Sequence, residues 1–475
     1  MDNIQLFFER IKGKKVAFCG AGVTNTPMVE MFISKGCDVT VCDKRTADKL
    51  GEAAERFEAL GAKLKLGDDY LNGIDADIIF RTPGMRFYIP ELEQYRQNGV
   101  TVTSELEVFL ELCPAHIIGI TGSNGKTTTS TIIAKTLEAD GKKVWLGGNI
   151  GKALMPDLER ISPDDWVVCE MSSFQLISMR RSPDIALITN ITPNHLDMHK
   201  DMEEYIDSKK NIFVHQSAFG RAVFNADCPV VGEFVGQQRG EGLTFSRRKL
   251  PHWGAYADEQ GDIWFSDRGK VRRIMNRSDI RIPGWHNVEN YLAAICVLAG
   301  IVSDKAIIDT AHLFAGVEHR AEFIRCLDGV SYYNDSIATT PSRCISGTLS
   351  MYDRRIIMIA GGYDKKIPFD EMGPVVCNKV KTLILMGVTA DKIESAVRGC
   401  REFKDSGVSI IRVNSLEEAV TAARDAAEDG DIVSLSPACA SFDMFPNFET
   451  RGRRFKELVN ALRPRKVRFD GEDED

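Results

Sequence analysis

The fold of the centre of this chain is decided by one stretch, Ile118-Gly119-Ile120-Thr121-Gly122-Ser123-Asn124-Gly125-Lys126-Thr127-Thr128. An apolar strand runs into a glycine-rich turn, and the residues that follow, 128–138, have a helical pattern. Glycines in this setting expose backbone N–H groups at a helix N-terminus, and the lysine can reach the outer phosphates of a nucleotide. Ile120 stands where the usual P-loop formula has its first glycine. A simple strand-to-helix turn would not require Gly-Lys-Thr, so we predict a nucleotide-binding loop.

Short apolar strands and amphipathic helices alternate along the chain in three blocks. The predicted strands are residues 15–19, 38–42, 77–80 and 101–103, then 116–120, 166–170 and 185–189, then 355–360, 382–386, 409–413 and 431–435. Such alternation indicates parallel sheets flanked by helices. We therefore predict an α/β protein with three domains, at residues 1–104, 105–316 and 317–475. Residues 220–281, rich in glycine, arginine and turn residues, are predicted to be an irregular insertion in the second domain.

Composition narrows the class of protein. A chain of 475 residues exceeds one ordinary core, and its 43% hydrophobic and 27% charged residues are typical of globular proteins. We find no signal peptide and no apolar run long enough to cross a bilayer, so we expect a cytoplasmic protein without membrane insertion. A net charge of −8 argues against broad nucleic-acid binding, which needs a basic face. The twelve cysteines show no spacing typical of zinc sites.

Further candidate groups follow the other strands of the middle block. Glu170 ends a predicted strand, and a carboxylate there, beside a P-loop, suits Mg²⁺, although it could also cap the next helix. His195 follows a strand end and a proline turn, but a lone histidine is more often structural than a ligand. Lys209 lies on a helix whose polar face would ordinarily be solvated.

The first block contains Gly20-Ala21-Gly22 after its first strand and Asp43 after its second. This pattern resembles a dinucleotide fingerprint, but Asn25 occupies the place of the third glycine. A dehydrogenase is therefore weakly supported.

The motif Thr-Gly-Ser-Asn-Gly-Lys-Thr-Thr resembles the ATP loop of the Mur ligases and the folylpolyglutamate synthetases. The resemblance to these enzymes covers almost the whole chain. It implies an N-terminal Rossmann-like substrate domain, a central P-loop ATPase domain and a C-terminal Rossmann-like domain. The implied reaction is ATP-dependent amide formation through an acyl phosphate, with ATP and two Mg²⁺ ions. The residues implied for ATP are Gly122, Ser123, Asn124, Gly125, Lys126, Thr127, Thr128, Asn287, Asn290, Arg320 and Asp335.

The same resemblance implies the metal ligands. Thr127 and Glu170, the latter in Glu-x-Ser-Ser-Phe-Gln, correspond to ligands of one Mg²⁺, and His195 to a ligand of a second. Lys209 corresponds to a lysine that reacts with CO₂ to give a carbamate, because the family places it four residues after a tyrosine, here Tyr205. A carbamate offers the anionic oxygens that hard cations prefer, whereas an ammonium repels them. Lys126, His195 and Lys209 are thus the candidate catalytic residues.

The outer blocks imply the substrates. Residues 434–452, which include Ser-Pro-Ala-Cys-Ala-Ser-Phe, resemble the signature of D-glutamate-adding Mur ligases, which implies UDP-N-acetylmuramoyl-L-alanine and D-glutamate as small-molecule partners. By the same resemblance, the residues implied for the UDP substrate are Thr24, Asn25, Asp43, Arg45, Thr82, Gly84 and Asn149, and those implied for the amino acid are Thr339, Lys365, Ser441, Phe442 and Phe448. Ile337 stands where the family often has lysine, and Phe442 where leucine is commoner.

Two other interpretations stay open. Another Mur-type or folylpolyglutamate-type ligase would share the ATP site but need a different first domain. A non-catalytic ATP- or dinucleotide-binding regulator need not keep Glu170, His195 and Lys209 together. For the leading interpretation, a Mur-type ligase, we expect a monomer.

Overall fold

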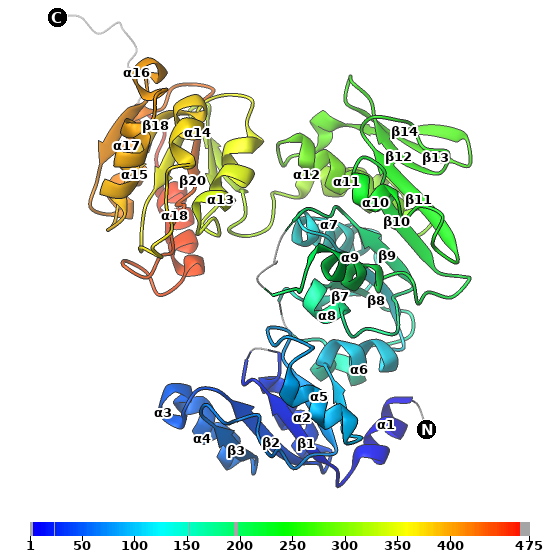
Figure 1. Cartoon of the computed structure of the whole chain (residues 1–475). Coiled ribbons are helices and arrows are strands. Elements are labelled where there is room, and N and C mark those ends of the chain that lie inside the picture. The colour runs from blue at the N-terminus through cyan, green and yellow to red at the C-terminus, as the bar shows by residue number, and fades with distance from the viewer. Residues whose placement is uncertain (1–2, 23, 152, 194–197, 466–475) are drawn as a thin grey trace, which may run out of the picture. The chain divides into compact units, whose positions relative to one another are not determined.

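The computed structural model describes residues 3–22, 24–151, 153–193 and 198–465. The chain divides into two compact units, the first formed by Met1–Asp279 with Val288–His312 and the second by Ile280–Asn287 with Leu313–Asp475. Among the described residues there are three β-sheets flanked by helices (Figure 1), which confirms the predicted α/β class. No helix within these described ranges is long and apolar enough to span a membrane.

The first sheet, drawn in blue in Figure 1, has five parallel strands in the order β3-β2-β1-β4-β5. Its strands are β1 (Lys15–Cys19), β2 (Asp38–Asp43), β3 (Lys63–Leu66), β4 (Ile78–Arg81) and β5 (Thr101–Thr103), and its helices are α1 (Asn3–Ile11), α2 (Thr26–Ser34), α3 (Ala47–Leu50), α4 (Glu52–Ala59) and α5 (Pro90–Gln97). Phe32 of α2 packs on Phe18 and Phe80 on one face, and Leu92 of α5 packs on the other. Both faces of this sheet are therefore covered, as in doubly wound folds.

The second sheet has nine strands in the order β14-β13-β12-β11-β10-β9-β6-β8-β7. The strands are β6 (His116–Thr121), β7 (Val144–Gly148), β8 (Trp166–Glu170), β9 (Ile185–Ile188), β10 (Arg221–Asn225), β11 (Glu241–Ser246), β12 (Gly254–Ala257), β13 (Asp262–Asp267) and β14 (Lys270–Asn276). The helices along this part are α6 (Glu105–Leu112), α7 (Lys126–Ala139), α8 (Ser173–Leu176), α9 (Met202–Lys210), α10 (Pro229–Gly232), α11 (Trp285–Leu298) and α12 (Asp304–Leu313). In the register of the two strands, Ile120 of β6 lies opposite Glu170 of β8, so the P-loop and this carboxylate follow neighbouring strand ends.

The prediction that residues 220–281 form an irregular insertion is wrong. This segment supplies strands β10 to β14, which extend the central sheet. Strands β12 to β14 pair in antiparallel fashion, unlike the parallel pattern on which the prediction relied. Arg268 and Gly269 both have positive φ (48° and 92°) and form the two-residue turn between β13 and β14. Such a turn is a hairpin signal that the abundance of polar residues obscured.

The third sheet lies in the second unit, with the order β15-β16-β20-β17-β18-β19 and only β15 antiparallel among its described strands. Its elements are β15 (Glu322–Leu327), β16 (Val330–Asn334), α13 (Pro341–Cys344), β17 (Ile356–Ala360), α14 (Met372–Lys379), β18 (Val380–Leu385), α15 (Ala390–Gly399), α16 (Phe403–Ser406), β19 (Ser409–Arg412), α17 (Leu416–Ala426), β20 (Ile432–Leu435) and α18 (Phe448–Ala461). Met358 of β17 belongs to the core cluster with α14 and α15, and Ile359 to the one with α17 and α18. Successive strand residues thus bury both faces.

Candidate active site

The phosphate loop connects β6 to α7 in the first unit. Gly122 (φ +150°) and Gly125 (φ +82°) adopt backbone conformations that favour glycine. A Cβ on Gly122 would lie 1.9 Å from Thr189 Oγ1, so no larger residue fits there. The helix α7 begins at Lys126, directly after the left-handed Gly125. Its N-terminus can therefore offer N–H groups to an anion, as the sequence predicts.

Residues that follow β9, together with Tyr205 of α9, hold this loop in shape. Ser123 Oγ donates to Thr192 O (3.0 Å) and lies 2.9 Å from Tyr205 Oη, while Asn124 N donates to Asn190 Oδ1 (2.9 Å). Lys126 Nζ donates to the loop carbonyls of Gly122 (2.9 Å) and Ser123 (3.3 Å). The lysine therefore lies over the loop from the first turn of α7, which also contains the half-buried Thr128.

A buried carboxylate adjoins the loop. Thr127 Oγ1 donates to Glu170 Oε2 (2.7 Å), and Asn149 Nδ2 donates to Glu170 Oε1 (2.8 Å). Glu170 is almost completely buried. A hydroxyl and a carboxylate next to a phosphate loop are the hard oxygen ligands that Mg²⁺ accepts, so Thr127 and Glu170 fit such an ion. Asn149, a candidate for the UDP substrate, has its side chain hydrogen-bonded to this carboxylate.

Lys209 is a buried lysine beside the same loop. Its side chain is 2% exposed, and Nζ donates to Thr121 Oγ1 (3.2 Å) and Gly122 O (3.1 Å). Burial, followed by the positive charge of Lys126, lowers the pKa of Lys209 to about 7. An appreciable fraction of its amine is therefore neutral and nucleophilic at neutral pH. The adjacent Lys210 is only partly buried and pairs with Asp207 (3.5 Å).

Three further candidates of the middle block are His195, Asn287 and Asn290. His195 lies outside the described residues. Asn290, on α11, accepts a hydrogen bond from Thr129 Oγ1 at Oδ1 (3.1 Å), and this oxygen would lie 2.7 Å from a Cβ on Gly125. It is therefore beside the phosphate loop. Asn287 Nδ2 donates to Pro283 O (2.6 Å).

The UDP-substrate candidates of the first sheet lie near the carboxyl ends of β1, β2 and β4. Asp43 accepts hydrogen bonds from Ala21 N (2.7 Å) and from Arg45 Nε (2.9 Å). Burial alone would raise the pKa of Asp43, but the hydrogen bonds from Arg45 and Ala21 and the charge of Arg45 together outweigh it and lower the pKa to about 2. Asn25 is buried and its amide donates to Cys19 O (3.2 Å) and Gly20 O (3.0 Å), so it holds the turn after β1.

Thr24 lies in that same turn, and Thr82 and Gly84 follow β4. The side chain of Thr82 packs against Gly20, where a Cβ would lie 2.8 Å from Thr82 Cγ2. The turn after β1 and the loop after β4 are therefore neighbours.

Arg320 and Asp335 belong to the second unit. Asp335 is buried, its Oδ1 accepts from Ala321 N (3.1 Å), and its Oδ2 accepts from Thr348. Burial raises the pKa of Asp335 to about 6, although these hydrogen bonds act in the opposite direction. Arg320 is the central residue between His319 and Ala321, which both have positive φ.

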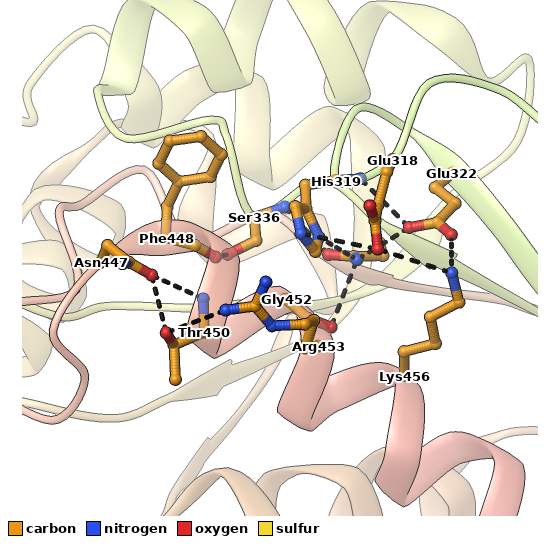
Figure 2. Close-up of polar contacts among 11 residues, drawn as sticks. Glu318, His319, Glu322, Ser336, Asn447, Phe448, Thr450, Gly452, Arg453 and Lys456 are labelled. Atoms are coloured by element: carbon orange, nitrogen blue, oxygen red, sulfur yellow. Dashed lines mark hydrogen bonds and ion pairs between the residues drawn. The ribbon is translucent and has the colours of Figure 1, made fainter. Parts of the chain in front are cut away.

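The amino-acid candidates lie in loops and at a helix start of the same unit. Lys365 Nζ donates to Thr339 Oγ1 (3.4 Å), which brings these two predicted residues together. Ser441 is buried, whereas the side chain of Phe442 is 63% exposed. Phe448 begins α18, and its carbonyl accepts from Ser336 Oγ (2.8 Å; Figure 2).

Comparison with known proteins shows the family to which this chain belongs. Residues 120–298 match the Mur ligase middle domain, and residues 319–439 match the Mur ligase, glutamate ligase domain. The chain is 49% identical over 459 residues to the UDP-N-acetylmuramoylalanine–D-glutamate ligase of Acetivibrio thermocellus, covering 96% of this chain and 98% of that protein. The chain belongs to the Mur ligase family.

A second relative and two solved structures are also similar to this chain. The enzyme of the same name from Clostridium acetobutylicum is 46% identical over 96% of this chain and 98% of its own. Among solved structures, a UDP-N-acetylmuramate–alanine ligase from Thermotoga maritima matches with a TM-score of 0.55 at 18% identity, covering 94% of this chain and 99% of that chain. A pseudomurein peptide ligase type C from Methanothermus fervidus has a TM-score of 0.53 at 20% identity over 94% and 99% of the two chains. The predicted three-domain fold is thus confirmed, while the residue boundaries of the domains stay a prediction.

Sequence reasoning missed one buried residue of this Mur ligase. Arg451 is completely buried, and its guanidinium donates to Ser336 O (2.9 Å), Cys439 O (3.0 Å) and Ala440 O (3.1 Å). It therefore ties the segment after β16 to the segment that contains Ser441. Its only sequence signal is its place within residues 434–452, and nothing there distinguishes it from the partly exposed Arg454 nearby.

Proposed function

We propose that this Mur ligase joins D-glutamate to UDP-N-acetylmuramoyl-L-alanine at the expense of ATP, a step of peptidoglycan synthesis. The observation that carries the proposal is the 49% identity, over nearly the full length of both chains, to a protein named for this reaction. The P-loop, the adjoining carboxylate and the buried lysine support an enzyme rather than a binding regulator. We expect it to act in the cytoplasm as a monomer.

The proposed reaction has two steps. The substrate carboxylate attacks the γ-phosphoryl group of ATP to give an acyl phosphate and ADP, and the amine of D-glutamate then displaces phosphate. The loop N–H groups, the start of α7 and Lys126 would neutralise charge at the transferred group. Bound Mg²⁺ would add further charge neutralisation, with Thr127 and Glu170 as the residues that hold it. By resemblance, Arg320 reaches the nucleotide phosphates, and Asn287, Asn290 and Asp335 contact the nucleoside.

We further propose that Lys209 is carbamylated and helps to hold a second Mg²⁺ with His195. Its burial and its lowered pKa support this, because a neutral amine can attack CO₂ and an ammonium cannot. The carbamate would exchange a positive charge beside the loop for a negative one that a metal ion can balance.

The substrate contacts are proposed from the family resemblance. The UDP substrate would contact Thr24, Asn25, Asp43, Arg45, Thr82, Gly84 and Asn149, and D-glutamate would contact Thr339, Lys365, Ser441, the backbone of Phe442, and Phe448. Lys365 would serve as the counter-ion of a glutamate carboxylate. The hydrogen bond between Lys365 and Thr339 supports a common pocket for these two residues.

Phosphate release with single omissions tests the proposal. With ATP and Mg²⁺ present, we expect release only when both UDP-N-acetylmuramoyl-L-alanine and D-glutamate are added, with L-glutamate, L-lysine and diaminopimelate inactive. Preference for L-lysine or diaminopimelate would assign the chain to another Mur-type reaction. Consumption of NAD(P)H in place of ATP would refute the ligase assignment.

A further inference from the structure

The turn that carries Arg320 has an unfavourable backbone. His319 (φ +63°) and Ala321 (φ +43°), on either side of Arg320, both adopt the left-handed conformation that residues with a Cβ rarely adopt. Such conformations persist where surrounding contacts impose them. The contacts that hold this turn therefore determine where the Arg320 side chain is presented.

Two carboxylates hold the turn, one on each side of Arg320. Asp335 Oδ1 accepts the Ala321 N–H (3.1 Å), and Glu322 Oε2 accepts the His319 N–H (3.1 Å). Asp335 is already a candidate nucleotide contact, whereas Glu322 has no part in the proposed reaction. Glu322 holds the backbone of the turn at His319.

Helix α18 supplies the counter-ion of Glu322, as Figure 2 shows. Lys456 pairs with Glu322 Oε1, and Asn334 Nδ2 donates to Glu322 Oε2 (3.1 Å) and to His319 Nδ1 (2.9 Å). The side chain of Glu322 is 8% exposed, so its charge is balanced mainly by Lys456. Gly452 of α18 lies against the imidazole, since a Cβ there would be 2.2 Å from His319 Nδ1.

The same group could be taken for a metal site, because ligand atoms of Glu318, His319 and Glu322 lie within 4.8 Å of one another. However, the carboxylate of Glu322 already accepts hydrogen bonds from the His319 N–H and the Asn334 amide, and it pairs with the Lys456 ammonium. Nδ1 of His319 in turn accepts a hydrogen bond from Asn334. The ammonium of Lys456 is the cation of this cluster. The contacts therefore favour a structural support of the turn over metal binding.

We propose that Glu322 is a positioning residue for ATP binding, which fixes the left-handed turn at His319 so that Arg320 is held for the nucleotide phosphates. Lys456 is its counter-ion and links the turn to α18, whose first residue is the amino-acid candidate Phe448. The inference rests on the proposed function through the assignment of Arg320 to the nucleotide.

Binding of MgATP to the full chain, measured by titration calorimetry without acceptor or amino acid, tests the proposal. Glu322→Met keeps the side-chain volume but removes the acceptor of the His319 N–H, so we expect Kd for MgATP to rise about tenfold. Glu322→Gln keeps an acceptor oxygen and should stay within about threefold of the wild type. The matched control is Glu318→Ala. Glu318 neighbours the same turn but is 60% exposed, so the Kd of this variant for MgATP should equal that of the wild type.

A double-mutant cycle separates positioning from general stability. Arg320→Ala should weaken MgATP binding by itself, and adding Glu322→Met should then have no further effect, because Glu322 acts through Arg320. If Glu322→Met fails to fold, Lys456→Met, on the partly exposed side of α18, should raise Kd about threefold. An unchanged Kd in folded Glu322→Met, or a full additional loss in the Arg320→Ala background, would overturn the inference. A wild-type protein that does not bind MgATP would instead refute the proposed function.

Discussion

Lys209→Ala is expected to lower the rate of ligation about 10³-fold or more, and added formate is expected to restore part of it. Removing charge stabilisation at a transferred group typically costs this much. Formate can occupy the space left by the truncated side chain and supply the carboxylate oxygens of the missing carbamate. Initial rates of phosphate release, measured with increasing formate for the variant and the wild type, check this prediction.

The matched control is the next residue along α9. Lys210 is partly buried and pairs with Asp207, so Lys210→Ala should keep nearly wild-type activity and should not respond to formate. A fully active Lys209→Ala enzyme, or an inactive but folded Lys210→Ala enzyme, would show that the reactive lysine is misassigned. A mass increase of 44 Da at Lys209, seen under conditions that preserve carbamates, would be independent support.

Lys126→Ala is expected to lower the rate of ATP turnover about 10³-fold or more, while the thermal unfolding midpoint stays close to that of the wild type. Lys126 Nζ donates to the loop carbonyls of Gly122 and Ser123, and the side chain is not part of a hydrophobic core. Its loss should therefore affect phosphate binding far more than folding.

Lys135→Ala is the control for this variant. Lys135 lies on the same helix α7 but pairs with Glu138 at the surface (2.7 Å), so its removal should leave turnover unchanged. Measurable wild-type turnover by folded Lys126→Ala protein would exclude the assigned loop.

Local signals allowed much of the fold to be predicted. The strand expected at residues 116–120 is β6 (His116–Thr121), and the helix expected from residue 128 begins at Lys126. Both follow from an apolar run, glycine punctuation and helical spacing, which act within a few residues of each other. Strands such as β3 (Lys63–Leu66), where lysine and leucine alternate, were missed because half of their residues are polar.

The candidate site depended more on tertiary context. The polarity of α9 predicts a solvated helix, yet Lys209 is buried because α9 packs beside the phosphate loop. The contact of Asn149 with Glu170 comes from strands β7 and β8, whose register no local pattern reports. Arg451 likewise gained its role from acceptors distant in sequence. Without the family resemblance, the residues alone would support a nucleotide site but not its substrates.

In the proposed reaction, a substrate carboxylate becomes an acyl phosphate and then an amide of D-glutamate. UDP-N-acetylmuramoyl-L-alanine labelled with ¹⁸O at both carboxylate oxygens, incubated with the full chain, ATP, Mg²⁺ and D-glutamate, tests it by mass spectrometry of phosphate and product. We predict that each released phosphate carries one labelled oxygen and that the product contains glutamate with the other label in its new amide. Unlabelled phosphate, or a product without glutamate, would contradict this mechanism.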